Sequence, residues 1–258
     1  MEILKEIYNY RQMVYSLVRR DLRGRYKASV LGFLWTFINP LLQLVIYTIV
    51  FSIILKSGID KYYLFLFVAL VPWIFFQASI TGGSSSIIAQ QDLVKKIYFP
   101  REVIPISYVT SCFVNMLFSF IIIFLVVLVS GIQLNILGVF CLPVIMLVEY
   151  IMAVGFALIA SAVTVYFRDL EHILSIITMA WMYLTPVLYS VDMIPEDLRK
   201  VFMLNPMVPI IDAYREVLYY GGVPNLKSLL NGFILGVLFL AAGFIVFGKL
   251  KKHFAEEL

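Results

Sequence analysis

Six long runs of apolar residues constrain the fold of this chain more than any other feature. They cover about residues 30–55, 62–88, 103–130, 136–164, 173–190 and 228–248. A helix needs about 20 such residues to cross the hydrocarbon core of a bilayer. Only 14% of the residues are charged and 62% are hydrophobic, whereas a soluble domain carries about 25% charged and about 45–50% apolar residues. The sequence therefore predicts an all-α integral membrane protein with six transmembrane helices in a single transmembrane domain that covers residues 1–258.

The segment before the first run, residues 2–27, predicts an N-terminal amphipathic interfacial helix. Apolar residues recur every three or four positions from Ile3 to Val18, which is the pattern of a helix with one apolar face. The opposite face is basic and carries Lys5, Arg11, Arg19, Arg20, Arg23 and Arg25. Basic helices of this kind lie along the headgroups rather than crossing the bilayer. Packing on a soluble partner is the alternative, and it is compatible with the first role.

The distribution of Lys and Arg predicts the orientation. The two terminal segments and the connections on their side hold fourteen of these residues, and the connections on the opposite side hold six. Because cytoplasmic connections carry the excess of positive charge, both termini are expected in the cytoplasm. Six spans, an even number, also place both termini on the same side of the membrane. The expected location is the bacterial cytoplasmic membrane.

Residues 191–227, between the fifth and sixth runs, contain two short apolar-rich candidates for helices. They lie at about 195–204 and 209–220, and Asn205-Pro206 separates them. At 1.5 Å per residue each reaches about 15–18 Å, half of a bilayer. We expect a short external re-entrant helical hairpin here, and a loop lying on the membrane surface is the alternative.

The chain lacks the motifs of an enzyme that would work alone. The stretch from Gly243 to Lys249 approaches a phosphate-binding loop, but Leu250 follows where Ser or Thr is needed, and the stretch ends an apolar run. Cys112 and Cys141 have no metal-binding or disulfide spacing. We therefore expect no catalytic residue, no metal and no nucleic-acid partner. ATP hydrolysis is expected to belong to a separate subunit.

Several motifs resemble one family of membrane proteins. They are RDLRGRYKASVLGFLW at 20–35 with Asn39-Pro40, KKIYFPRE at 95–102, YFRD at 166–169, TPVLY at 185–189, and LNP at 204–206 with Tyr214-Arg215. In this order and spacing they resemble the permease subunits of ABC exporters of O-antigen, teichoic acid and capsular polysaccharides. The likeness covers nearly the whole chain.

The resemblance implies a partnership and a cargo. Two copies of the chain would pair with two ABC ATPase subunits, which would bind the ATP and Mg²⁺, so that this chain itself holds no cofactor. The polymer would arrive on an undecaprenyl diphosphate carrier. The external re-entrant helices, at about 195–220, would close the channel. The ATPase-coupling residues would lie in the link after the second span, namely Asp92, Lys95, Lys96, Tyr98, Phe99, Pro100, Arg101 and Glu102.

Two further groups of residues are candidates for contact with the substrate. Arg20, Arg23, Arg25 and Lys27 could bind the lipid diphosphate, because cations at the membrane surface attract such a group; orientation and contact with anionic membrane lipids would account for the same charges. Aromatic rings with polar edges suit a sliding sugar polymer, although packing is the ordinary role of any one ring. Glu149 is deep in a span, where an acid is a functional candidate or a partner for a neighbouring helix. The channel-lining candidates, mainly in the first and fifth spans, are Phe33, Phe37, Tyr47, Glu149, Trp181, Tyr183 and Tyr189.

The sequence thus predicts the transmembrane subunit of an ATP-driven exporter of an undecaprenyl-diphosphate-linked polysaccharide of the O-antigen or teichoic acid type. ABC export of a small lipid or drug is the first alternative. An intramembrane glycan-handling enzyme is a second, but it needs an acidic cluster, and Asp169 with Glu171 is the only close pair near a membrane face. A secondary transporter would need internal repeats.

Overall fold

The computed structural model describes residues 2–26 and 30–258, and within these the protein is a bundle of helices without strands. Five helical segments in this described part are long and apolar enough to cross a membrane. They are Gly32–Ile54, which includes α3 (Trp35–Thr48), α4 (Tyr62–Ser85), α6 (Val103–Val129), α7 (Ile136–Tyr166), and Leu226–His253, which begins with α11 (Leu226–Leu250). The expected all-helical membrane architecture is confirmed.

The fifth expected span, 173–190, takes a different form. Its helix, α8 (Leu170–Leu184), has 15 residues, which gives about 22 Å at 1.5 Å per residue. Pro186 follows shortly afterwards, and the residue before it, Thr185, is extended at φ −107° and ψ 132°, as the steric clash with a proline ring requires. A full sixth span remains a prediction, because the 15 residues of α8 are fewer than the about 20 that a helix needs to cross hydrocarbon.

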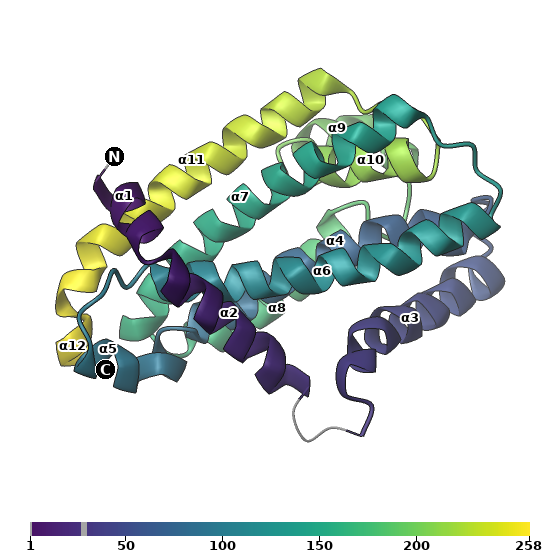
Figure 1. Cartoon of the computed structure of the whole chain (residues 1–258). Coiled ribbons are helices and arrows are strands. Elements are labelled where there is room, and N and C mark those ends of the chain that lie inside the picture. The colour runs from purple at the N-terminus through teal and green to yellow at the C-terminus, as the bar shows by residue number, and fades with distance from the viewer. Residues whose placement is uncertain (1, 27–29) are drawn as a thin grey trace.

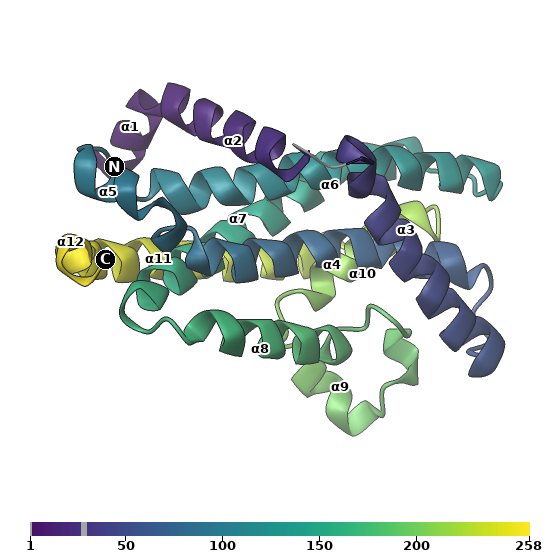
Figure 2. The same ribbon diagram turned by 90° about the horizontal axis from the view of Figure 1, so that it is seen from below.

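The N-terminal segment forms two helices, α1 (Glu2–Asn9) and α2 (Arg11–Tyr26). Helix α2 lies along α6, as Figure 2 shows. Leu17 is buried in this contact, and Ser111 of α6 donates a hydrogen bond to the carboxylate of Asp21. The placement of these helices at a membrane interface remains a prediction.

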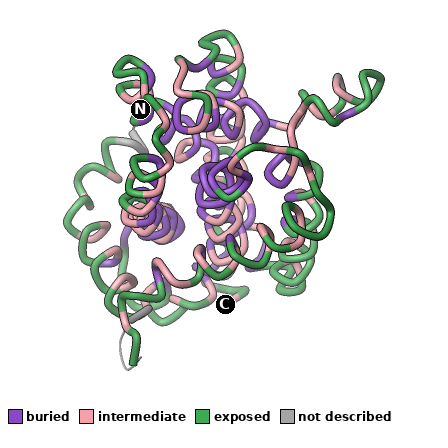
Figure 3. Tube along the Cα trace, turned by 90° about the vertical axis from the view of Figure 1, so that its right-hand side faces the viewer, coloured by how far each residue is buried: buried purple, intermediate pink, exposed green. Residues whose placement is uncertain are grey.

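Helix α4 forms the centre of the bundle, and the first span lies at its edge. In its most apolar stretch, 78% of α4 is buried, against 11% for the first span. Seen along the bundle, buried positions gather at the centre and exposed ones surround them (Figure 3). The first span leans away from the other helices (Figures 1 and 2). Its outward face is apolar and exposes Leu42, Val45, Ile46, Ile49 and Ile53.

Helices α7 and α11 pack with their backbones in close approach. A Cβ atom at Gly155 would lie 2.6 Å from the backbone nitrogen of Leu240, and one at Gly243 would lie 2.7 Å from the carbonyl oxygen of Gly155. Small residues allow this approach between membrane helices, where lipid removes most of the hydrophobic driving force. No larger side chain fits at these two positions unless the helices separate.

The two ends of the bundle differ in content. Both chain termini lie at one end, together with α5 (Gln91–Lys96) and α12 (Phe254–Glu257) (Figure 1). The other end carries α10 (Val208–Leu218), which packs against α4, α7 and α11. Helix α9 (Glu196–Phe202) projects from the bundle near the end of α8 instead (Figure 2). The two short helices expected near 195–220 are therefore present but separated, and their re-entry into a membrane remains a prediction.

Candidate functional site

A large hollow opens between α2, α6 and the turn that precedes α3. Its volume is about 1450 Å³. Apolar side chains form much of its wall, and Phe33 and Phe118 meet there edge to face with their ring centroids 5.0 Å apart. Cationic side chains from α2 line the same space, namely Arg11, Arg19, Arg20 and Arg23. The hollow therefore combines guanidinium groups, which bind phosphates in a bidentate manner, with an apolar surface for a hydrocarbon chain.

Two of the four predicted diphosphate-binding residues, Arg20 and Arg23, line this hollow. Arg25 belongs to the last turn of α2, but its side chain and all of Lys27 lie outside the described residues. Arg11 and Arg19 also line the hollow and were not among the candidates. Arg11, Tyr15, Arg19 and Arg23 follow one another at intervals of four residues, so they share one face of a helix. This spacing could have identified Arg11 and Arg19 as candidates from the sequence.

The predicted coupling residues divide into an exposed group and a buried group. The exposed group is Asp92, Lys95, Lys96 and Tyr98; Tyr98 is 95% exposed, and Lys96 pairs with Asp92 at 3.5 Å. The buried group faces the bundle: Phe99 and Glu102 are buried, and Pro100 and Arg101 are partly buried. The first group is available to a partner protein, and the second fixes the link to the membrane helices.

At the opposite end, the buried Arg215 of α10 holds the irregular segment that follows α8. Its guanidinium donates to the carbonyl oxygens of Pro186 and Val187, the second at 2.6 Å. The same group lies 3.7 Å from the ring centroid of Phe65 in α4. Buried carbonyl groups outside regular structure need donors, and Arg215 supplies several of them at once.

Other side chains satisfy the rest of this segment. Tyr62 of α4 donates to the carbonyl oxygen of Leu188 at 2.8 Å. Asn205 donates to the Thr185 hydroxyl at 2.8 Å and to the Leu184 carbonyl at 3.1 Å. Three motifs that are far apart in the sequence, at 185–189, 204–206 and 214–215, thus form one hydrogen-bonded cluster at this end of the bundle.

The predicted channel-lining residues occupy unlike environments. Phe33 and Tyr183 are exposed, at 42% and 55%, whereas Phe37, Tyr47 and Tyr189 are partly buried. Trp181 packs inward, with its ring centroid 5.3 Å from that of Phe76 and 5.5 Å from that of Phe156.

Glu149 has no exposed surface in this conformation. Its Oε2 atom accepts a hydrogen bond of 2.8 Å from Tyr214 of α10. The carboxyl group therefore joins the middle of α7 to α10 and does not face an open path.

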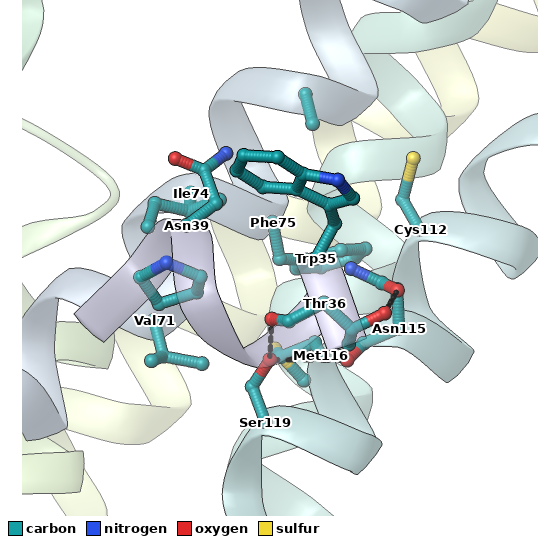
Figure 4. Close-up of a pocket in the computed structure, with 12 residues that line it drawn as sticks. Trp35, Thr36, Asn39, Val71, Ile74, Phe75, Cys112, Asn115, Met116 and Ser119 are labelled. Carbon is teal, nitrogen blue, oxygen red and sulfur yellow. Dashed lines mark hydrogen bonds between the residues drawn. The ribbon is translucent and has the colours of Figure 1, made fainter. Parts of the chain in front are cut away.

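A small pocket of about 70 Å³, lined by both polar and apolar side chains, lies where α3 meets α4 and α6 (Figure 4). Pro40 has no N–H group for the carbonyl of Thr36, one turn earlier. Ser119 of α6 donates to that carbonyl at 3.4 Å, and the Thr36 hydroxyl donates to Asn115 at 3.0 Å. These contacts attach α3 to α6 at the proline.

Comparison with known proteins identifies the family to which the chain belongs. The sequence profile of the ABC-2 type transporter family matches residues 12–219. The O-antigen export system permease protein RfbA of Myxococcus xanthus is 34% identical over 260 residues and is covered in full, as is this chain. A protein of the same name from Klebsiella pneumoniae is 36% identical over 94% of this chain and 93% of its own length. The polysialic acid transport protein KpsM of Escherichia coli is 24% identical over 88% of this chain and 90% of its own. The family resemblance is thereby confirmed, and the chain belongs to the ABC-2 type transporter family.

Proposed function

We propose that this chain is the transmembrane subunit of an ATP-driven exporter of a cell-surface polysaccharide linked to undecaprenyl diphosphate. The hollow beside α2 is the observation that carries the proposal, because it places four arginines next to an apolar wall. A lipid with a diphosphate headgroup fits both surfaces, because charge-assisted hydrogen bonds would hold the phosphates and the apolar wall would accommodate the hydrocarbon chain without burying polar groups. The relatives' names favour an O-antigen or capsule-like polymer over a teichoic acid.

The carrier would approach along the membrane plane. Its headgroup would meet Arg19, Arg20 and Arg23 on the cytoplasmic side, and its isoprenoid chain would lie against Phe33 and Phe118. The polymer would then pass between two copies of the chain. The exposed apolar faces of the first span and of α8 support this arrangement, with Phe33 and Tyr183 turned outward from the bundle.

The partner ATPase would dock on the exposed part of the coupling segment. The short helix α5 lies at the end that holds both termini (Figure 1), which would be the cytoplasmic end, and the exposed Tyr98 follows this helix by two residues. ATP and Mg²⁺ would bind to the partner subunit, and this chain would carry no cofactor. Nucleotide binding would then move α5 relative to the bundle.

Depletion of this chain in its host tests the proposal. The measurement is the amount of undecaprenyl-linked glycan on each side of the cytoplasmic membrane. Full-length polymer that accumulates inside while the surface loses it supports export. Loss of polymer synthesis would favour an intramembrane enzyme, and unchanged pools on both sides would favour export of a small lipid.

A further inference from the structure

The segment after α11 packs on the link at residues 97–102, which follows the short helix α5. We refer to α5 as the coupling helix, because it belongs to the predicted ATPase-coupling segment. The segment after α11 comprises a turn at Lys251–His253 and helix α12. Lys251 Nζ lies 2.6 Å from Glu102 Oε1, and Arg101 donates a hydrogen bond of 2.5 Å to the backbone carbonyl of Lys251. Two neighbouring residues of the link therefore hold one residue of the tail by its side chain and its backbone.

The two partners of the ion pair, Glu102 and Lys251, differ in how far they are buried. Glu102 is completely buried, and its second oxygen, Oε2, has no hydrogen-bond partner among the described residues. Lys251 is partly exposed, with 30% of its side chain accessible. A buried carboxylate that loses its cation partner is strongly unfavourable. Removal of the Lys251 ammonium would therefore leave an uncompensated charge buried in the link.

Aromatic contacts tie the same tail to two membrane helices. Phe254 is fully buried; its ring centroid lies 5.4 Å from that of Phe247 in α11 and 6.3 Å from that of Tyr166 at the end of α7. The Tyr166 hydroxyl donates to the Leu250 carbonyl at 2.8 Å. The guanidinium of Arg101 lies 5.8 Å from the Phe254 ring centroid. The tail thus contacts the link, α7 and α11 together.

We propose that residues 251–258 are a strut that positions the coupling helix, with Lys251 as the positioning residue. The residues between α5 and α6, 97–102, are irregular, so the link alone would absorb a displacement of α5. With Glu102 and Arg101 fixed to the tail, that displacement reaches α7 and α11. These helices move as one unit because Gly155 and Gly243 bring their backbones into contact, and α7 in turn contacts α10 through Glu149.

The strut rests on the proposed function, because it assumes an ATPase that displaces α5. The test compares Lys251→Met with Lys252→Met, which removes the same charge from an exposed neighbouring position. Each variant is purified in complex with its ATPase and reconstituted in proteoliposomes. The readouts are the amount of ATPase bound, the rate of ATP hydrolysis, and the amount of polymer exported per ATP.

We expect Lys252→Met to behave as the wild type. Lys251→Met should retain ATPase binding and hydrolysis but lose about five- to tenfold in polymer exported per ATP, which is the lower end of typical coupling between sites. Lys251→Arg, which keeps the positive charge, should retain most of the export per ATP that Lys251→Met loses. Equal export per ATP for Lys251→Met and Lys252→Met would overturn the proposal.

Two further measurements cover other outcomes. If Lys251→Met fails to fold, the double variant Glu102→Gln with Lys251→Met removes the buried charge as well, and normal coupling in that variant would also refute the strut.

Amide hydrogen exchange of residues 91–99 should accelerate in Lys251→Met and stay unchanged in Lys252→Met. This measurement needs no cargo. A wild-type complex that binds no ATPase and exports no polymer would count against the proposed function, while the exchange comparison would still decide on the strut.

Discussion

Tyr214 donates a hydrogen bond of 2.8 Å to Glu149, and both side chains are completely buried. This contact links α10 at one end of the bundle to the middle of α7. The second carboxyl oxygen of Glu149 has no partner among the described residues. The Tyr214 hydroxyl is therefore the main polar contact that accounts for an acid at this depth.

Replacing Tyr214 with Phe should destabilise the protein, because it leaves Glu149 buried without a hydrogen bond. We expect a loss of about 1–2 kcal/mol in the free energy of unfolding, as for other buried hydrogen bonds between membrane helices. Glu149→Gln should be milder, since the amide oxygen still accepts from Tyr214. Thermal unfolding in detergent measures both, with the exposed Tyr8→Phe as the control; equal melting temperatures for Tyr214→Phe and Tyr8→Phe would contradict the assignment.

Arg215→Lys should open the cluster at the end of the bundle that holds α10. A lysine ammonium is a point charge and cannot bond several carbonyl groups at fixed angles as a guanidinium does. A cysteine placed at the buried Leu188 should then react faster with a membrane-impermeant maleimide. Arg199→Lys, in the partly exposed pair with Asp192, is the matched control, and similar labelling rates in the two backgrounds would disprove the role of Arg215.

Neutralising Arg20 and Arg23 together should weaken binding of undecaprenyl diphosphate. Hydrogen bonds to charged groups contribute about 1.5–3 kcal/mol each, so the dissociation constant in nanodiscs should rise at least about tenfold. The residual binding should be less sensitive to salt. Lys249→Gln, which removes an exposed cation from the last turn of α11, should leave binding unchanged. If the double variant binds as tightly as the wild type, the hollow is not the headgroup site.

Tyr98→Ala should reduce the binding of the partner ATPase without reducing the stability of this chain. The side chain of Tyr98 is 95% exposed, so its removal leaves no cavity, and aromatic residues at the centre of an interface often contribute more than about 2 kcal/mol. Co-purification of the ATPase and thermal unfolding are the two measurements. Undiminished co-purification would place the docking surface elsewhere.

Asp212, in the short helix α10, predicts a dependence of stability on pH. Burial raises the pKa of this carboxyl group to about 6, the charge of Arg215 opposes the shift, and those of Asp192 and Glu216 add to it. The unfolded pKa is about 3.9, so the folded protein binds the proton more tightly. The contribution of this group is thus favourable below about pH 4 and is lost as the pH rises through about 6. Asp212→Asn should melt above the wild type at pH 7, and the gap should narrow toward pH 4; a gap independent of pH would contradict this.

The apolar runs of the sequence were sufficient to predict an all-helical membrane bundle, because the length needed to cross hydrocarbon is a strong constraint. They were less informative for the run at 173–190. There the apolar character continues past Leu184, but Pro186 ends the helix, and the carbonyl groups that follow are satisfied by a side chain 28 and 29 residues further on. Hydropathy indicates which segments avoid water, but it does not indicate which groups form hydrogen bonds with the backbone.

The candidate site shows the same division. The basic face of residues 2–27 could be predicted from the sequence, because the basic residues recur with the period of a helix. The roles of Lys251 and Arg215 could not be predicted, because in the sequence each is one of several cations near the end of a helix. The role of Lys251 depends on its contact with Glu102, which lies 149 residues away in the sequence. No local sequence pattern predicts such a contact.

The weak packing of the first span has a consequence for how the transporter assembles. Only 11% of the most apolar stretch of this helix is covered by the rest of the molecule. Lipid solvates the outward face of this helix as well as protein does, so within one protomer the span is held only along the side that contacts α4 and α6. Contact with a second copy in the assembled transporter would then cover the outward face and fix the position of the span.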